Sequence, residues 1–404
     1  MEQINFGVST KNIPIPDLAE YRVQMIHSVN KFVRNIRWKS HFALNPQDRG
    51  ETKETFQLKS TKAPPQVPQL VEFEEKLFDL TRNIKHKDPR EIKSEFQKKL
   101  DADVEVIKQE QKVIVWADKT TNFYKMKKED YDELLMKDIN KDYKKASSEV
   151  EDKINKDAKK VAKKLEVADR VFKMEKKEAV VTIKDHKPNY RNNTKTRLIN
   201  PTKSYLGKVS KIKLASIIHK VKMRTKLSQW KNTSSVIHWF KGLSNKHRLK
   251  FIQFDINSYY PKITEDLLTR ALDWAGTITT ISGDDRELFR HTKESLLFDG
   301  KDTWVKKGNT NFDVGMGSYD GAETCDIVGL FLLSKLQHLP IQVGLYRDDG
   351  LAVSGARAQQ VEKLKQKIHA VFEENGLQIA AEANLTVVDF LDVTLDLKSD
   401  SYKP

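Results

Sequence analysis

The sequence holds one cysteine and no long apolar run. A single thiol, Cys325, cannot form a disulfide within the chain and leaves no thiolate cluster for zinc, so we expect a small buried residue. No stretch approaches the roughly 18 apolar residues of a membrane span, and residues 1–5 lack the basic and apolar regions of a signal peptide. The sequence therefore predicts an intracellular protein, nuclear or cytoplasmic, with no membrane partner.

Acidic residues are outnumbered by basic ones. The 404 residues include 72 Lys and Arg against 57 Asp and Glu, which gives a formal charge of +15. Such an excess favours polyanions, either nucleic acid or an anionic membrane face, and charge alone does not choose between them. The length allows two or three domains or one large multi-lobed enzyme.

The first 170 residues are rich in charge. Residues 1–65 end in Lys62-Ala63-Pro64-Pro65, which suits a boundary, and we interpret them as an N-terminal extension. Between residues 139 and 165, apolar residues recur at steps of three and four, which predicts one long amphipathic helix. Its opposite face could contact phosphates or could simply be solvated, and it carries Lys156, Lys159, Lys160, Lys163 and Lys164.

Two strands are expected at residues 179–184 and 196–200, separated by a polar, turn-prone stretch, and together they predict a basic hairpin. A lysine-rich segment follows at residues 203–231. After it, Ser234 and Ser235 are expected to cap a helix.

The C-terminal part has the pattern of one sheet with helices. A strand is expected at residues 250–256 and an apolar helix at 323–336. A hairpin is expected at 341–353, a second amphipathic helix at 361–372, and a final strand pair at 377–380 and 387–397. This order predicts an α+β fold in which helices cover one face of an antiparallel sheet, in the manner of ferredoxin-like cores.

Three aspartates lie where this sheet would bring them together. Asp255 ends an apolar strand, where an unpaired carboxylate is costly, and Asp348 and Asp349 lie at the expected hairpin tip, where Gly350 would supply the turn. Each aspartate alone could be a turn or cap residue. Together they could hold two Mg²⁺ ions, or Mn²⁺, that activate a hydroxyl and neutralise a departing phosphate.

These residues resemble a known family. Phe254-Asp255 with Tyr260 five residues later resembles motif A of reverse transcriptases, and Tyr346-Arg347-Asp348-Asp349 resembles their motif C. The resemblance implies a right-hand polymerase with fingers and palm, in which Asp255, Asp348 and Asp349 are the catalytic, metal-binding residues. Tyr260 matches the family's steric gate, which excludes the ribose 2′-hydroxyl and so selects deoxynucleotides. An aromatic strand end is the alternative reading of Tyr260.

The basic hairpin resembles the family's fingers segment that grips the incoming triphosphate. Arg197 corresponds to the triphosphate arginine, whose planar fork suits phosphate. Lys184 and Lys187 are both candidates for the accompanying lysine, and we favour Lys184. Lysines between this hairpin and Asp255 lie where a template or primer backbone runs in the family, and those we expect to bind nucleic acid are Lys203, Lys208 and Lys211.

The segment Val314-Gly315-Met316-Gly317-Ser318 resembles motif B, where a glycine lets the backbone approach the nucleotide, so Met316 and Gly317 are expected to contact it. The motif departs from the family because Tyr319 follows Ser318 where proline is usual. No lysine matches motif D, since Lys365 and Lys367 lie on the preceding helix. Core packing and stacking on bases are both open to Trp230, Trp239 and Trp274, and core packing is favoured.

The Met-Gly-Ser variant, with Ala117-Asp118-Lys119 upstream and Phe390-Leu391-Asp392-Val393 downstream, is similar to Penelope-like and other non-LTR retroelement reverse transcriptases. This resemblance covers about residues 112–404. The last residues, Tyr402-Lys403-Pro404, fall where the primer-grip hairpin of the family is still forming. We therefore expect the thumb to be absent or truncated, and no GIY-YIG endonuclease module is present in the sequence.

The resemblance implies an RNA-directed DNA polymerase that uses an RNA template, a DNA primer and deoxynucleoside triphosphates. Two alternatives stay open: a catalytically impaired or truncated nucleic-acid-binding protein derived from a retroelement, and an RNA-directed RNA polymerase, which Tyr260 disfavours. The expected domains are an extension (1–65), a charged helical N-terminal or fingers region (66–170), fingers (171–250), and a palm (251–404) with a fingers-like insertion at about 276–313.

Overall fold

The polypeptide passes between two structural units after residues 138, 180 and 197. The computed structural model describes residues 1–4, 17–49, 56–85, 87–88, 91, 93–110, 112–171, 176–308 and 310–404. The first unit comprises Met1–Asp138 and Val181–Arg197, and the second comprises Ile139–Val180 and Leu198–Pro404. No helix within these residues combines the length and apolar character that crossing a bilayer requires.

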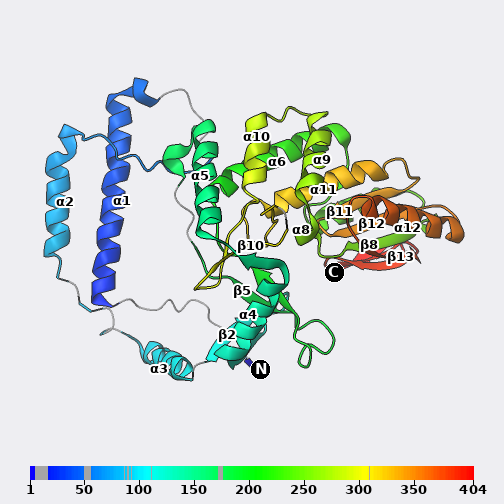
Figure 1. The fold of residues 1–404 in the computed structure, drawn as a ribbon, viewed down its shortest axis with the longest axis horizontal. Coiled ribbons are helices and arrows are strands. Elements are labelled where there is room, and N and C mark those ends of the chain that lie inside the picture. Colours follow the sequence, from blue (N-terminus) through cyan, green and yellow to red (C-terminus); the bar gives the residue numbers. More distant parts are fainter. Residues whose placement is uncertain are drawn as a thin grey trace. The chain divides into compact units, whose positions relative to one another are not determined.

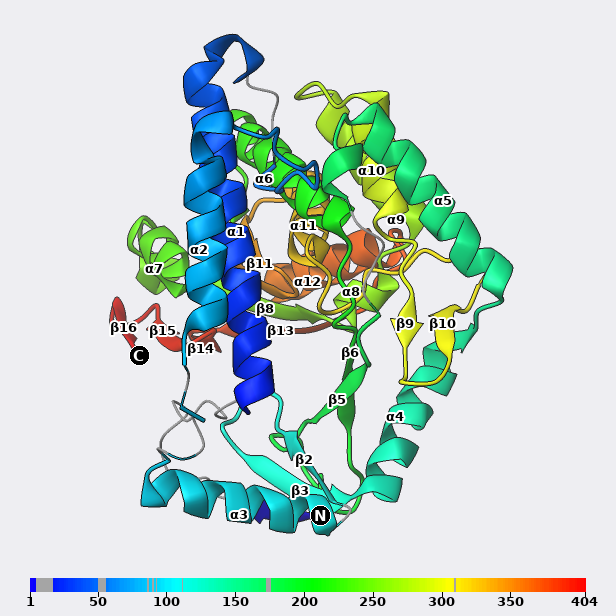
Figure 2. The same ribbon diagram turned by 90° about the vertical axis from the view of Figure 1, so that its left-hand side faces the viewer.

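The first unit begins with helices. Helices α1 (Leu18–Leu44) and α2 (Val71–Asn83) lie side by side (Figure 2), and Arg37 donates to both carboxylate oxygens of Glu74 between them. Asp17 caps α1 by accepting a hydrogen bond from the backbone N–H of Glu20 at 2.8 Å. Two short 3-10 helices lie between α1 and α2, namely η1 (Pro46–Arg49) and η2 (Pro68–Leu70).

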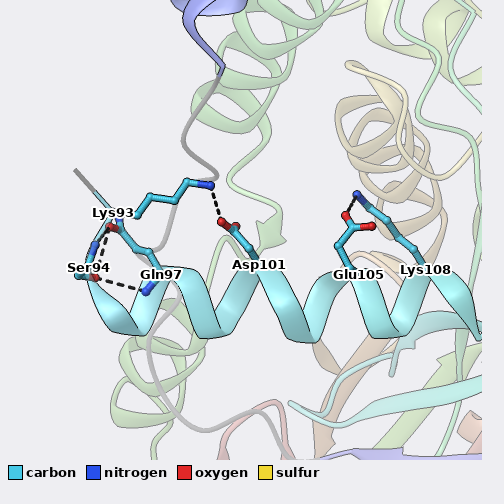
Figure 3. A network of polar contacts seen from close by, with 6 residues as sticks. All are labelled: Lys93, Ser94, Gln97, Asp101, Glu105 and Lys108. Carbon is cyan, nitrogen blue, oxygen red and sulfur yellow. Dashed lines mark hydrogen bonds and ion pairs between the residues drawn. The ribbon is translucent and has the colours of Figure 1, made fainter. Parts of the chain in front are cut away.

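Helix α3 (Glu95–Gln109) shows how a local signal fixes a helix start. The Ser94 hydroxyl accepts from the backbone N–H of Gln97, and the Gln97 side chain accepts from the backbone N–H of Ser94 (Figure 3). Ion pairs of Lys93 with Asp101 and of Lys108 with Glu105 follow along the helix. The Lys108–Glu105 pair is exposed, and such pairs add little to stability.

A small antiparallel sheet in the first unit has the order β1-β3-β2. Its strands are β1 (Glu2–Ile4), β2 (Lys112–Trp116) and β3 (Phe123–Lys127), and α4 (Lys128–Asp142) follows β3 directly. The core beside it is formed by Val115, Ala117, Tyr124, Met126 and Ile183. The predicted basic hairpin is confirmed, because β5 (Val180–Ile183) pairs with β6 (Thr196–Ile199).

The main sheet of the second unit has the order β13-β8-β12-β11-β7. Its first four strands are antiparallel, and β7 pairs with β11 in parallel. Helices α11 and α12 pack on each other and on strands of this sheet (Figure 1). The elements are β7 (Ser228–Gln229), β8 (Lys250–Ile256), α11 (Gly321–Leu336), β11 (Gln342–Tyr346), β12 (Asp349–Ser354), α12 (Ala358–Glu373) and β13 (Ile379–Leu385). This succession of strand, helix, hairpin, helix and strand confirms the α+β prediction.

Side chains of β8 alternate between the two faces of the sheet. Phe254 packs on Phe372 of α12 with ring centroids 5.5 Å apart. Phe251 instead joins Leu351 and Val353 in a core with the sheet β14-β15-β16 and α7. These elements are α7 (Thr233–Lys241), β14 (Val387–Phe390), β15 (Val393–Asp396) and β16 (Ser401–Lys403). The strand expected at 387–397 is therefore two strands, because Leu391 turns the chain with a φ of 56°.

The remaining elements of the second unit include the three-stranded sheet β4-β10-β9 and the helices α6, α8 and α9, which contact α11. They are β4 (Tyr143–Lys145), α5 (Ser148–Lys164), η4 (Ala168–Arg170), α6 (Tyr205–Thr225), η5 (Lys246–Arg248), α8 (Tyr259–Lys262), α9 (Glu265–Gly276), α10 (Gly283–His291), β9 (Leu297–Phe298) and β10 (Thr303–Lys306). Cys325 is buried in α11, as expected.

Three local predictions are wrong. The long helix expected at 139–165 is interrupted by β4, because pairing with β10 and a buried 2.8 Å hydrogen bond from Tyr143 to Asp313 outweigh the helical pattern. Asn232, not Ser234 or Ser235, caps α7 by accepting from the backbone N–H of Ser235 at 3.0 Å. The lysine-rich segment at 203–231 contains α6, whose buried face was not predicted.

Candidate active site

The β11–β12 hairpin closes with a two-residue turn at Arg347 and Asp348, since Tyr346 pairs with Asp349. Arg347 has a φ of 55°, a conformation that non-glycine residues seldom adopt and that is often found at functional sites. Gly350 was predicted to supply this turn, and that prediction is wrong. It lies within β12, where an added β-carbon would be 2.1 Å from the ring of Phe254, so this position needs glycine for packing.

The sheet register brings the three predicted aspartates to one end of neighbouring strands. Asp349 lies directly opposite Asp255 in the β12–β8 pair, and the backbone N–H of Ile256 donates to the carbonyl of Asp348 at 2.9 Å. Because directly opposite residues share a face, the carboxyl groups of Asp255 and Asp349 lie on the same face of the sheet. Asp255 is exposed, so the expected cost of burying it does not arise.

The donor set of this site consists of carboxylate oxygens. Within the described parts of the chain, no three or more acidic, histidine or cysteine side chains form a ready group of metal ligands. Mg²⁺ commonly takes one or two protein carboxylates and completes its shell with water and substrate phosphates. An open site with paired carboxylates fits that ion better than a closed protein cage would.

Tyr259 and Tyr260 join the site to α11. Tyr259 is buried, and its hydroxyl donates to the carbonyl of Cys325 at 2.8 Å. Tyr260 is half-buried, and burial raises the pKa of its hydroxyl. A β-carbon at Gly321 would lie 3.6 Å from the Tyr260 ring, so the first turn of α11 supports this side chain closely.

Asp326 is a titratable group that the sequence reading missed. Its carboxylate accepts from the Gln229 side chain at 3.1 Å. Burial raises its pKa from 3.8 to about 6, and Glu323 adds to the rise while Arg347 opposes it. The available signal was a carboxylate three residues after Glu323 in an otherwise apolar helix.

The motif B segment folds back on the end of β6. The backbone N–H of Asn200 donates to the carbonyl of Met316 at 3.0 Å. Gly317 has a φ of 105°, and a β-carbon there would lie 2.4 Å from the carbonyl oxygen of Asn200. Glycine at this position therefore permits contact between two backbone segments. Contact of Met316 and Gly317 with a nucleotide stays a prediction.

A buried aspartate lies at each end of this segment. Asp313 accepts the hydrogen bond from Tyr143. Asp320 accepts from Thr292 at 2.8 Å and from Ser210, and it lies 2.7 Å from the ammonium group of Lys293. Lys293 and Asp320 are both almost completely buried. The two charged atoms approach without hydrogen-bond geometry, so their pairing is chiefly electrostatic.

The first unit holds the predicted triphosphate residues of the basic hairpin. Arg197 donates to Asp118 at 2.9 Å. Lys184 is half-buried, and burial lowers the pKa of its ammonium group, with Arg197 lowering it further. Lys187 is exposed. The structure thus places Lys184 near Arg197, and the carboxylates of Asp118 and Asp138 both favour the charged form of Lys184.

The other predicted contacts lie along α6 and in the core. The ammonium groups of Lys203 and Lys208 lie 5.0 and 5.2 Å from the ring centroid of Tyr319. Lys211 lies 3.7 Å from Glu323. Trp230 is buried against Trp239 and Phe390, and the Trp274 ring packs beside Phe331. Core packing is thus confirmed for Trp230.

Comparison with known proteins finds similarity in structure but not in sequence. No protein-family model matches the chain, and no curated protein matches it. Among solved structures, apo telomerase from Candida tropicalis aligns with a TM-score of 0.52 and 11% identity over 82% of this chain and 65% of that one. Telomerase from Candida albicans, in complex with a fragment of telomeric RNA, aligns with a TM-score of 0.51 and 11% identity over 86% of this chain and 61% of that one.

A C. tropicalis telomerase truncated of its C-terminal domain also aligns, with a TM-score of 0.51 and 10% identity over 72% of this chain and 63% of that one. This chain thus spans less than two thirds of the telomerase chains that it matches. At such identities the likeness shows the fold alone, which this chain shares with these telomerase chains. Membership of the Penelope-like group stays a prediction.

Proposed function

We propose that this chain is a template-directed nucleotidyltransferase that extends a DNA primer on an RNA template. The observation that carries the proposal is the pairing of Asp349 directly opposite Asp255, with Asp348 at the adjoining turn. Transfer of a nucleotide by two metal ions needs carboxylates that lie close enough together to hold both ions. The palm of a right-hand polymerase would then be the sheet β13-β8-β12-β11 with α11 and α12.

Asp255, Asp348 and Asp349 would hold Mg²⁺ in this reaction. Bound Mg²⁺ supplies a lowered pKa for the primer 3′-hydroxyl and neutralises charge on the departing pyrophosphate. Arg347 turns the chain at a positive φ, and the hydrogen bond from the backbone N–H of Ile256 to the carbonyl of Asp348 holds the hairpin tip beside β8. Gly350 and Phe254 pack together beneath it and limit movement of the hairpin.

The basic hairpin would bind the triphosphate. Arg197 has a planar fork that suits phosphate oxygens, and its present partner is Asp118. Lys184 has a lowered pKa because it is half-buried near Arg197, so an arriving polyanion would favour its charged form. These two residues are proposed to hold the nucleotide by charge, whatever base it carries.

Tyr260 would select the sugar. It lies on α8, and its ring is close to the first turn of α11, where a β-carbon at Gly321 would be in ordinary contact with it at 3.6 Å. A rigid ring beside the sugar excludes a 2′-hydroxyl by contact, which favours deoxynucleotides.

Primer extension on an RNA template tests the proposal. Asp348→Asn should lower the rate by at least about 100-fold, since several kcal/mol of charge stabilisation depend on this carboxylate. Asp284→Asn makes the same change of charge at an exposed position in α10 and should extend primers like the parent.

Two outcomes contradict the proposal. Equal extension by Asp348→Asn and the parent would remove Asp348 from the active site. Preferred incorporation of ribonucleotides over deoxynucleotides on the same template would overturn the role of Tyr260 and favour RNA synthesis instead.

A further inference from the structure

A cavity of about 550 Å³ lies beside the motif B segment, wholly within the second unit. Its size falls within the range of small-molecule sites. Helix α5 lines it with Lys156, Lys159 and Lys163, and the residues after Gly317 line it with Ser318 and Tyr319. None of these side chains belongs to the carboxylate site or to the triphosphate hairpin.

The lysines of α5 divide into two groups. Lys160 pairs with Asp157 at 2.8 Å, and Lys164 pairs with Glu287. The three lysines that line the cavity are exposed, and no carboxylate of the described residues forms an ion pair with them. They are spaced three and four residues apart and so share one face of the helix. This is the lysine face whose role the sequence left open.

Acidic groups also line the cavity, and most of them have partners. Asp320 is paired with Lys293, whereas Glu294 lies 3.5 Å from His291 and forms an ion pair only when that histidine is protonated. Asp152 is exposed on the first turns of α5. The three lysines therefore leave the mouth of the cavity with an excess of positive charge.

Tyr319 gives the cavity an aromatic wall. A β-carbon at Gly207, which also lines the cavity, would lie 3.3 Å from the Tyr319 β-carbon, so the tyrosine packs closely on α6. Lys203 and Lys208 lie within 5.2 Å of its ring centroid. The Ser318 hydroxyl is buried and has no hydrogen-bond partner among the described residues. It has almost no accessible surface and lies against Gly321 of α11, where an added β-carbon would be 2.7 Å away, so a molecule in the cavity does not reach it.

We propose that this cavity binds one nucleotide of a single-stranded nucleic acid. A nucleotide combines a flat ring for Tyr319 with a phosphate for the lysines of α5. Stacking on an aromatic side chain contributes about 1 to 3 kcal/mol per base, and phosphate contacts add affinity that depends on salt. This site goes beyond the proposed polymerase reaction, because it uses none of the three aspartates.

Binding of a fluorescent twelve-nucleotide oligo(U), measured by anisotropy in EDTA, tests the site without any catalysis. The pair Lys156→Ala/Lys159→Ala should weaken binding by about 10-fold and lower the slope of log Kd against log salt by about 1. The matched pair Lys160→Ala/Lys164→Ala removes the same charge from the same helix and should change Kd by less than about 2-fold. Equal losses in the two pairs would overturn the proposal.

Tyr319 gives a second, independent measurement. Tyr319→Phe keeps the ring and should bind like the parent, whereas Tyr319→Ala should bind about 5- to 10-fold more weakly. The exposed lysine variants keep the proposal testable if Tyr319→Ala does not fold. Unchanged binding by a folded Tyr319→Ala would overturn the stacking role.

Competition identifies the source of the nucleotide. Displacement of oligo(U) by 5′-AMP from the parent, but not from Tyr319→Ala, would support a site that also takes free nucleotides. Displacement by inorganic phosphate to the same extent as by AMP would overturn the proposal, since no base would be needed. Asp348→Asn should bind oligo(U) like the parent, so failure of the polymerase proposal and failure of this one give different results.

Discussion

The fold raises the pKa of Asp326 into a range where its effect on stability can be measured. Its pKa is raised from 3.8 to about 6, chiefly by burial, although Arg347, Lys222 and Lys231 oppose the rise. Between these two values the folded protein binds a proton that the unfolded chain releases. Stability therefore falls as pH rises from about 4 to about 6, and the full cost is present above about 6.

Asp326→Asn should remove this cost while keeping an oxygen that accepts from Gln229. In urea unfolding without divalent ions, we expect the variant to be more stable than the parent at pH 7.5, by on the order of 2 kcal/mol. The gain should disappear as pH falls to about 4. The exposed Asp284→Asn serves as the control at both pH values. A variant less stable than the parent at pH 7.5 would contradict the raised pKa.

Single residues also show which features can be predicted from a sequence and which cannot. The aspartates 255, 348 and 349 were placed correctly on a strand end and a hairpin, because apolar alternation and a turn are local patterns. Gly350 was misread because its reason is not local. The Phe254 ring that excludes a β-carbon belongs to a neighbouring strand almost a hundred residues earlier in the chain.

Among the elements, the motif B segment is followed by Asp320, and the buried ion pair of Asp320 with Lys293 is expected to stabilise it. Removing one partner of such a pair leaves an uncompensated charge, which typically costs about 3 to 5 kcal/mol. Lys293→Met should therefore lower the free energy of unfolding by that amount. The double variant Lys293→Met/Asp320→Asn should recover part of the loss, because no charge then remains buried.

Lys164→Met gives the matched control for this prediction. It breaks an ion pair with Glu287 that is far more exposed, and should cost less than about 1 kcal/mol. Urea unfolding measures all three variants. If Lys293→Met and Lys164→Met unfold at the same urea concentration, the buried pair does not hold the segment.

Element prediction succeeded where the pattern was local and failed where a distant strand decided it. Strand β8 and helix α12 follow plain apolar periodicity and were predicted well. Tyr143–Lys145 sits in a helical pattern yet forms a strand, because β10 supplies its partner. Helix α6 was missed although Leu206, Val209, Leu214, Ile217 and Val221 form its buried face, since the many lysines obscured that spacing.

For the whole molecule, the charge of +15 raises the question of whether nucleic-acid affinity depends on the overall charge or on local contacts, and the salt dependence of binding answers it. If only the overall charge attracts nucleic acid, replacing any three lysines should lower the salt slope of binding equally. If contacts are local, Lys203→Ala/Lys208→Ala/Lys211→Ala should lower the slope of log affinity against log salt by about 2 for a single strand. The control triple carries the same charge change at ion-paired positions of α2 and α3, namely Lys76→Ala, Lys98→Ala and Lys108→Ala.

Filter binding between 50 and 200 mM salt measures both triples. Equal slopes in the two variants would rule out a local site on α6. At this scale a polymerase fold was predicted from short motifs. The likeness to telomerase at 10–11% identity supports the prediction at the level of the fold, and the arrangement of fingers, palm and thumb stays a prediction. The division into two units could not be predicted, because it depends on contacts between remote segments. The four-part domain division stays a prediction.

The discontinuous first unit has a consequence for synthesis on the ribosome. Asp118 emerges early, but its partner Arg197 follows only after the whole of α5 has been made. Domains generally fold as units during synthesis. The first unit cannot complete its fold until its second segment, residues 181–197, has been translated. Until residue 197 leaves the exit tunnel, the nascent chain must carry Asp118 and the inner face of the β2–β3 hairpin without their native partners.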